Sequence, residues 1–143
     1  MREIIEEAYR SKEYDLSKEW VVTLEEIKYL AKSRTLNILN LGGGMLWGGS
    51  IEDMGVKEIA KSETITELEL SNNGKIGDEG LEAFIGNTAI RKLIIRFTRV
   101  SNEMYKKVEK GINKNIEEYE RYVIENEYYY RDIGKLVIQY VEE

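Results

Sequence analysis

The chain of 143 residues contains no cysteine, no histidine and no proline. Without cysteine it has neither disulfides nor thiolate metal ligands nor a cysteine nucleophile. Without histidine it lacks the commonest general base and the commonest metal ligand, so Ser–His and Cys–His catalysis are excluded within this chain. The acidic residues show no metal-ligand spacing. We therefore expect a protein that is not an enzyme and that uses no metal and no cofactor.

Long apolar runs and an excess of positive charge are also missing. The longest apolar runs resemble Leu93-Ile94-Ile95 in length, whereas a membrane-spanning helix needs roughly 20 apolar residues. The formal net charge is −6, which argues against nucleic-acid binding because phosphate neutralisation needs a basic face. The first residues mix charged and apolar types instead of forming the apolar segment of a signal peptide. We expect a cytoplasmic protein with no membrane and no nucleic-acid partner, and export by a specialised secretion system is left open.

What the chain does contain is a repeated pattern of apolar positions. The same spacing of three apolar residues occurs as Leu36, Leu39 and Leu41, as Ile65, Leu68 and Leu70, and as Ile90, Leu93 and Ile95. The segments 27–36 and 56–65 are identical at five positions, and both contain Ala-Lys-Ser. The recurrence predicts four strand–helix units that start near residues 11, 36, 65 and 90. A short strand and a helix with one apolar face cannot bury their apolar sides alone. The units are therefore expected to stack into a parallel sheet covered by helices.

The best-preserved unit carries a recognisable motif. Leu68-Glu69-Leu70-Ser71-Asn72-Asn73, followed by Ile76-Gly77-Asp78-Glu79-Gly80-Leu81, resembles the leucine-rich repeat of the ribonuclease-inhibitor-like type. The resemblance covers about residues 11–112, although Gly44 and Thr98 stand where the motif has its turn asparagine. It implies a short α/β solenoid with the parallel sheet on the concave side, the helices on the convex side and helical caps. It also implies that the function is binding another protein.

The two ends are expected to close this stack. Residues 1–10 have helical apolar spacing and are predicted to form an N-terminal capping helix, before the repeats of residues 11–112. Residues 113–143 are predicted to form a C-terminal helical cap or extension, although residues 135–141 are also rich enough in β-branched types for a strand. Seven of the ten tyrosines follow residue 104. They cover the last repeat or, alternatively, make the chain a self-associating structural protein.

A glycine-rich insertion in residues 42–50 is the first candidate site. The positions of Gly43 and Gly48 fit the spacing of a phosphate-binding loop, but Gly49 stands where that loop has its lysine. Nucleotide binding, or a small enzyme that uses this loop, is therefore the alternative function. We predict instead a rim loop that presents Met45, Leu46 and Trp47 to a partner, because Met and Trp are enriched in interfaces. Folding of these side chains onto the repeats is an equal alternative.

The concave face is the second candidate site, and strand alternation defines it. If Leu68 and Leu70 point inward, then Glu67, Glu69 and Ser71 point outward. Charges on neighbouring strands are alternatively a set of pairs that neutralise one another. We predict a monomeric, non-catalytic protein–protein interaction module that binds an unidentified protein. The partner-binding residues predicted on the concave face are Asp15, Ile38, Asn40, Glu67, Glu69, Lys92, Ile94 and Arg96.

Overall fold

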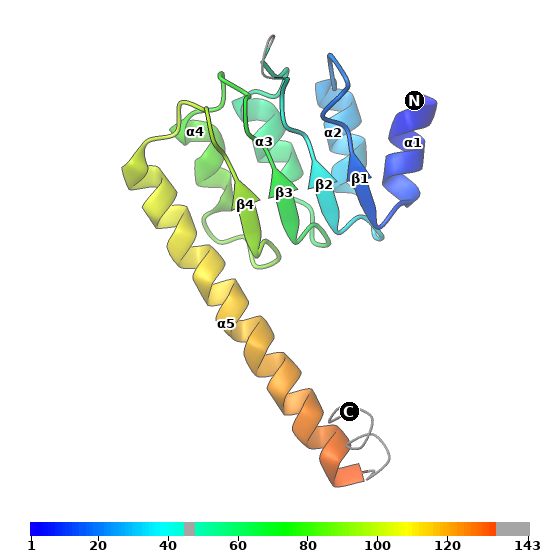
Figure 1. The fold of residues 1–143 in the computed structure, drawn as a ribbon, viewed down its shortest axis with the longest axis vertical. Helices are drawn as coiled ribbons and strands as arrows, with labels where there is room; N and C mark the ends of the chain where they lie inside the picture. Colours follow the sequence, from blue (N-terminus) through cyan, green and yellow to red (C-terminus); the bar gives the residue numbers. More distant parts are fainter. Residues whose placement is uncertain (45–47, 134–143) are drawn as a thin grey trace.

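The computed structural model describes residues 1–44 and 48–133, with side chains as far as residue 126. Four short parallel strands form one sheet in the order β1-β2-β3-β4. The strands β1 to β4 are Glu13–Asp15, Ile38–Asn40, Glu67–Glu69 and Lys92–Ile94. Helices form a second layer behind the sheet (Figure 1): α2 Leu24–Ala31, α3 Asp53–Ile59 and α4 Asp78–Leu81, the last continued by the 3-10 turn η1 Glu82–Phe84. The predicted α/β repeat fold is confirmed.

The strand register places the apolar positions of successive units side by side. Leu39 pairs with Leu68, and Leu68 pairs with Leu93. The side chains of the first two lie in the core between sheet and helices, together with Ile65 and Leu70. In the fourth unit Leu93 is only partly buried. The core is therefore closed in the middle of the stack and more open at β4.

The shared Ala-Lys-Ser sequence shapes the loop that returns from each helix to the next strand. Ser33 Oγ accepts the N–H groups of Thr35 and Leu36 at 3.2 and 3.0 Å. Ser62 Oγ accepts from the two equivalent residues of the next unit at 3.3 and 3.1 Å. Thr64 also donates to Ser33 O at 2.9 Å, across to the preceding unit. The identical residues are therefore explained by turns that tie each repeat to its neighbour.

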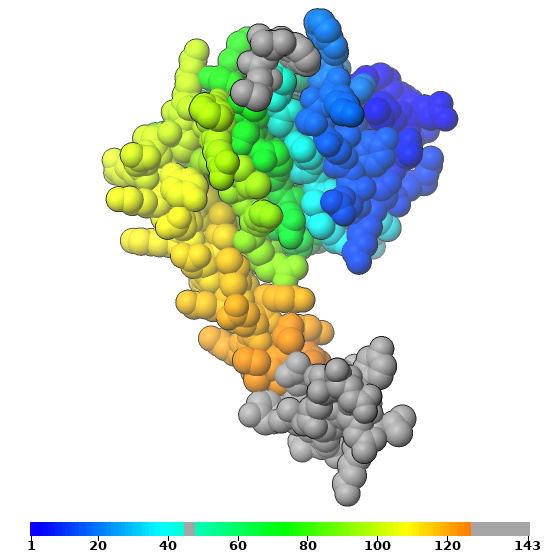
Figure 2. Space-filling view, viewed as in Figure 1, coloured from blue at the N-terminus to red at the C-terminus, as the bar shows by residue number. Residues whose placement is uncertain are grey.

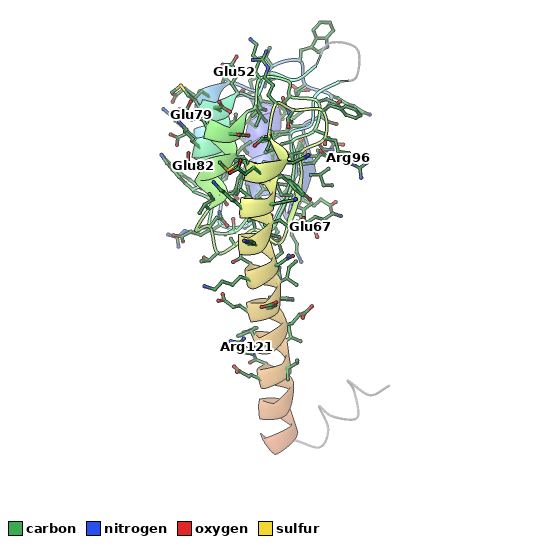
Figure 3. All side chains as sticks on the ribbon, turned by 90° about the vertical axis from the view of Figure 1, so that its left-hand side faces the viewer. Glu52, Glu67, Glu79, Glu82, Arg96 and Arg121 are labelled. Carbon is green, nitrogen blue, oxygen red and sulfur yellow. The ribbon has the colours of Figure 1, made fainter. Side chains whose placement is uncertain are left out.

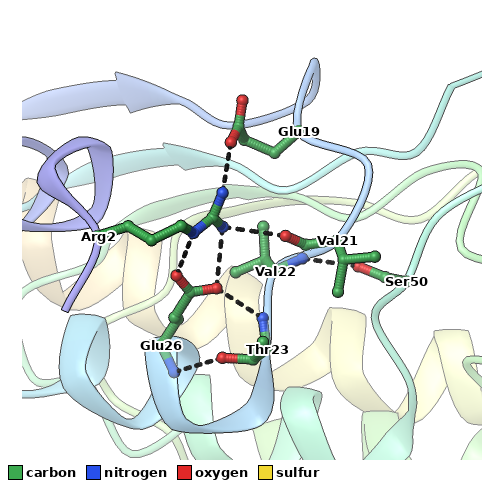
Figure 4. A network of polar contacts seen from close by, with 7 residues as sticks. All are labelled: Arg2, Glu19, Val21, Val22, Thr23, Glu26 and Ser50. Atoms are coloured by element: carbon green, nitrogen blue, oxygen red, sulfur yellow. Dashed lines mark hydrogen bonds and ion pairs between the residues drawn. The ribbon is translucent and has the colours of Figure 1, made fainter.

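The N-terminal end is closed by α1 (Glu3–Arg10) and by an ion-pair network around Arg2 (Figure 4). Arg2 donates to both carboxylate oxygens of Glu26, at 2.6 and 2.9 Å, and to Glu19 at 2.7 Å. Glu26 is 5% exposed and forms a capping box with Thr23 at the start of α2. The hydrogen bond from Arg2 lowers the pKa of Glu26 below its ordinary value. Glu26 thus links the first turn of α2 to the residue that precedes α1.

The first half of α5 (Asn102–Ile133) packs against the helix side of the C-terminal end, where it contacts α4 and η1. Val108 is buried, and Asn115 Nδ2 donates to Asn87 O and Ile90 O, both at 2.8 Å. The Arg91 guanidinium lies over the Tyr119 ring, 3.7 Å from its centroid. Beyond this contact α5 extends away from the repeats (Figures 1 and 2). In the described part of the chain, no helix combines the length and hydrophobicity that crossing a bilayer requires.

Candidate functional site

The open face of the sheet, which Figure 2 views, contains a hollow of about 570 Å³. Of the residues predicted for this face, Asp15, Ile38, Asn40, Glu67, Glu69, Lys92 and Ile94 line it; the other lining residues are Glu13, Tyr14, Leu39 and Leu68. All four strands contribute, because their register aligns equivalent residues across the sheet. The short strands therefore gather side chains from four repeats at one surface.

Three of these lining residues also hold the backbone where their strand ends. The side chains of Asp15, Asn40 and Glu69 each accept the N–H of the residue two positions later, at 2.8, 2.9 and 2.7 Å. They are aligned by the strand register, and Ile94 continues the row in β4. Sequence reasoning treated this row as partner contacts only. The row also fixes the turns of the first three units, which an alignment of the three polar residues could have indicated.

The charges of the hollow are unevenly distributed. Glu13, Asp15, Glu67 and Glu69 lie on β1 and β3, whereas Lys92 lies on β4. Glu67 and Lys92 are register neighbours, but no ion pair joins them in the described structure. Ile38 and Ile94 are half-buried among these charged groups. The face therefore combines a largely acidic surface with two accessible apolar side chains.

Arg96, the remaining residue predicted for the concave face, does not line this hollow. It lines a second hollow, of about 360 Å³, with Leu93, Ile95, Val100 and Tyr105 among the other lining residues. Figure 3 looks onto this end of the molecule and shows Arg96 and Glu67 on the sheet side of α5, and Glu79 and Glu82 on the helix side. Arg96 thus lines a neighbouring hollow, which shares Ile94 with the concave hollow.

The prediction that Ser71 points to the open face is wrong. Ser71 is 8% exposed, and its Oγ accepts the N–H of Arg96 at 3.0 Å. The next residue, Asn72, has a positive φ of 64°, so the chain has already left the extended conformation. The inward–outward alternation therefore holds through Leu70, which is buried as predicted, and breaks at Ser71.

Asn73 holds the middle of the stack together. Its side chain is fully buried, with Nδ2 donating to Leu41 O and Leu70 O at 2.9 Å and Oδ1 accepting from Ile51 N–H at 3.0 Å. Asn73 therefore satisfies backbone groups at the point where the chain leaves β3. Two of these three partners, Leu41 and Ile51, belong to the preceding repeat. Asn73 is thus a connector between repeats as well as a turn residue.

The base of the glycine-rich loop is packed against Asn72 and Asn73. A Cβ on Gly43 would lie 2.6 Å from Asn72 O, and one on Gly49 would lie 1.8 Å from Asn73 Oδ1. Gly43 N–H donates to Ser71 O at 2.8 Å, so it is not free for a phosphate. Close packing therefore explains Gly43, on which the nucleotide alternative partly rested, and Gly49, which stands at the lysine position of the phosphate-binding motif. Met45, Leu46 and Trp47 lie outside the described residues.

The acidic residues at helix starts are also structural. Asp53 Oδ1 accepts Gly77 N–H at 2.8 Å, and Asp78 accepts both the N–H and the hydroxyl of Ser101 at 2.7 Å. The hydrogen bond from the Ser101 N–H holds the pKa of Asp78 below its ordinary value. Each aspartate thus joins the start of one helix to the start of the next. Within the described residues, no group of three or more carboxylates is placed to hold a metal ion.

Comparison with known proteins decides the family. A family model described as "Leucine Rich repeat" matches residues 61–84, which include β3, its buried Asn73 turn and α4. The chain is a leucine-rich repeat protein. No curated protein matches this leucine-rich repeat chain significantly.

Two solved structures resemble this leucine-rich repeat protein. The first, titled "Leiomodin-1 Actin-Binding Site 2 (ABS2)", has a TM-score of 0.57 and 12% sequence identity, and the match covers 92% of this chain and 94% of that one. The second is a tropomodulin C-terminal domain from Caenorhabditis elegans, with a TM-score of 0.43, 16% identity, and coverage of 86% and 93%. At so low an identity the first likeness concerns the fold alone, which it shares over nearly its full length.

Proposed function

We propose that this leucine-rich repeat protein is a non-catalytic interaction module that binds a partner protein through the concave face of its sheet. The observation that carries the proposal is the 570 Å³ hollow, which all four strands line. An accessible face that combines apolar side chains with charges is suited to a protein partner, since apolar contacts supply affinity and charges supply specificity. The acidic residues of β1 and β3 favour a partner surface with basic residues.

The proposal extends to the identity of the partner, the oligomeric state and the cellular location of the protein. The leiomodin structure carries an actin-binding site in its title, so actin is a reasonable first protein to test. We further propose a monomer of the ribonuclease-inhibitor-like type, located in the cytoplasm. The loop residues Met45, Leu46 and Trp47 are proposed to contact the partner beside the concave face.

The test compares two substitutions that introduce the same charge on opposite surfaces. Ile38→Glu alters the concave hollow, whereas Met54→Glu alters an exposed apolar residue of α3 on the convex side. Tagged wild-type and variant proteins are incubated first with purified actin and then with cell extract, and captured proteins are quantified by mass spectrometry. We expect one or more proteins that wild type and Met54→Glu retain and Ile38→Glu loses. Undiminished capture by Ile38→Glu, with its melting temperature unchanged, contradicts the concave-face proposal.

The loop contribution needs a separate variant. Trp47→Ala is expected to weaken capture of the same proteins without changing the melting temperature, since an interface aromatic contributes more than most contacts. Unchanged capture by Trp47→Ala removes the loop from the proposed surface and leaves the concave face in place.

A further inference from the structure

The outer edge of β4 is an open sheet edge. No strand pairs with β4 on that side within the described residues. Lys92 N–H donates to Thr66 O at 3.0 Å, and Ile94 O accepts from Leu70 N–H at 2.8 Å, so these backbone groups face β3. In a parallel ladder the residue between them faces the opposite way. The N–H and C=O of Leu93 therefore face outward, where an added strand would bond.

A hollow next to this edge offers room for an extended segment. It has a volume of about 360 Å³ and is lined by Tyr105 of α5, by Leu93 of β4 and by Ile95, which follows β4. Leu93 and Ile95 are only partly buried, although their counterparts in the third unit, Leu68 and Leu70, are buried. The core at this end is thus short of apolar cover. A strand lying along β4 would supply both backbone hydrogen bonds and apolar side chains.

The charges around this edge are positive. Arg96 and Arg99 are exposed, and neither forms an ion pair with any residue that the structure describes. They stand out in a chain whose formal net charge is −6. Arg96 also lines the hollow itself. The Arg96 guanidinium at this hollow, with exposed Arg99 three residues further along the chain, favours a segment that carries carboxylates.

Phe97, between these two arginines, has an unfavourable conformation. It occupies the position that Asn72 has in the third unit, and both have a positive φ, 58° and 64° respectively. Asparagine tolerates this conformation, whereas a bulky aromatic residue is rarely found there. The Phe97 side chain is also 76% exposed, so burial does not offset the strain. Such strain is found where a side chain serves a function other than stability.

We propose that the outer edge of β4 binds an extended acidic segment of a partner protein by strand addition. The segment hydrogen-bonds to the outward backbone groups of Leu93, and its apolar side chains enter the 360 Å³ hollow. Its carboxylates pair with Arg96 and Arg99, and Phe97 contacts it at the end of the strand. This surface adjoins the concave hollow and shares Ile94 with it. It uses the outer edge of β4 instead of the open face of the sheet, so it goes beyond the proposed function and does not depend on it.

The test uses a short fluorescent peptide in which glutamate alternates with valine, and a control peptide with lysine in place of every glutamate. Fluorescence anisotropy is expected to show binding of the acidic peptide only, weakened by added salt. Arg96→Glu and Arg99→Glu are each expected to reduce the affinity at least about tenfold, which corresponds to 1.4 kcal/mol. The matched control, Arg34→Glu, changes an exposed arginine in the loop after α2 and is expected to leave the affinity unchanged.

Strand addition has its own test. The acidic peptide is N-methylated at either its odd or its even positions, which removes the N–H groups of one edge at a time. Only one of the two methylated peptides is expected to keep its affinity, since a strand uses one edge for pairing. Equal binding of both peptides overturns strand addition.

Two further measurements examine the role of Phe97 and the identity of the segment that binds to β4. Phe97→Asn is expected to raise the melting temperature and weaken peptide binding, a combination that a purely structural role would not produce. Light scattering of the protein with and without the peptide is expected to show no oligomer that the peptide dissociates. If the peptide dissociates an oligomer, the edge of β4 binds a second copy of this chain, which would overturn the proposal. Loss of binding in Ile38→Glu with no loss in Arg96→Glu would also overturn it, while supporting the concave face.

Discussion

The third and fourth repeats leave the sheet by the same path but are held in different ways. In the third repeat, the carboxamide of Asn73 bonds to two residues of the preceding repeat. In the fourth, the equivalent Thr98 donates to Ile95 O of its own repeat, at 3.0 Å. Backbone contacts such as Arg99 N–H to Ile76 O, at 2.8 Å, join the fourth repeat to the third. Side chains also join these two repeats, since Ser71 Oγ accepts the Arg96 N–H and Asp78 accepts from Ser101. The strand exit of the fourth repeat differs from that of the third because Thr98 bonds within its own repeat and Arg96 and Phe97 are exposed there.

The largest expected effect is the loss of the Asn73 side chain. Asn73→Ala leaves the buried groups Leu41 O, Leu70 O and Ile51 N–H without their partner, which we expect to cost about 3 kcal/mol of unfolding free energy. Thr98→Ala removes two partly buried hydrogen bonds, of which the one from Val100 N–H is long at 3.4 Å, and is expected to cost about 1 kcal/mol or less. Urea unfolding measures both. Equal losses would mean that the two repeats are held alike.

The next effect concerns the two halves of α5. Asn115→Ala leaves Asn87 O and Ile90 O without their partner, at a site where the asparagine is 6% exposed, and is expected to cost about 2 kcal/mol. Asn126→Ala removes an exposed hydrogen bond to Tyr122 O and is expected to cost less than about 0.5 kcal/mol. Both variants are followed by thermal unfolding. A large loss in Asn126→Ala would show that the projecting half of α5 also supports the repeats.

The N-terminal end should respond to pH through Glu26. The folded pKa of Glu26 is lowered from 4.5, so its ion pair with Arg2 stabilises the fold above that value. This contribution is lost as the pH falls through the folded pKa of Glu26. Glu26→Gln is expected to cost about 1–2 kcal/mol at pH 7. Its difference from wild type should shrink below about pH 4, as measured by urea unfolding across pH. A constant difference would contradict the assignment.

The smallest expected effect comes from substitutions at the position of positive φ that Phe97 occupies. Phe97→Asn is expected to stabilise the chain by up to about 1 kcal/mol, because asparagine adopts positive φ more readily. The reverse change, Asn72→Phe, is expected to destabilise the third repeat by about 1–2 kcal/mol. Calorimetry of the two single variants measures the change in stability that each substitution causes. A loss of stability in Phe97→Asn would show that the phenyl ring makes structural contacts.

Much of the architecture could be predicted from the sequence because apolar spacing is a local signal. Ile65, Leu68 and Leu70 with their counterparts indicated the number of units and the alignment of their apolar positions. The long-range polar contacts were not visible, since nothing in the sequence pairs Arg2 with Glu26 or Asn115 with Asn87. Ser71 was misplaced because periodicity does not show where a strand stops. The strained Phe97 could have been found by aligning it with Asn72 of the preceding repeat.

The packed part and the projecting part of α5 belong to one continuous helix, and this continuity has a mechanical consequence. A helix of 32 residues spans about 48 Å at 1.5 Å per residue, and its first half is fixed to the fourth repeat. The direction of the second half is therefore set by the contacts of Val108, Asn115 and Tyr119. The far end of the helix therefore lies at a set distance and in a set direction from the sheet. One residue added to the exposed part would advance that end by about 1.5 Å and turn it by about 100°.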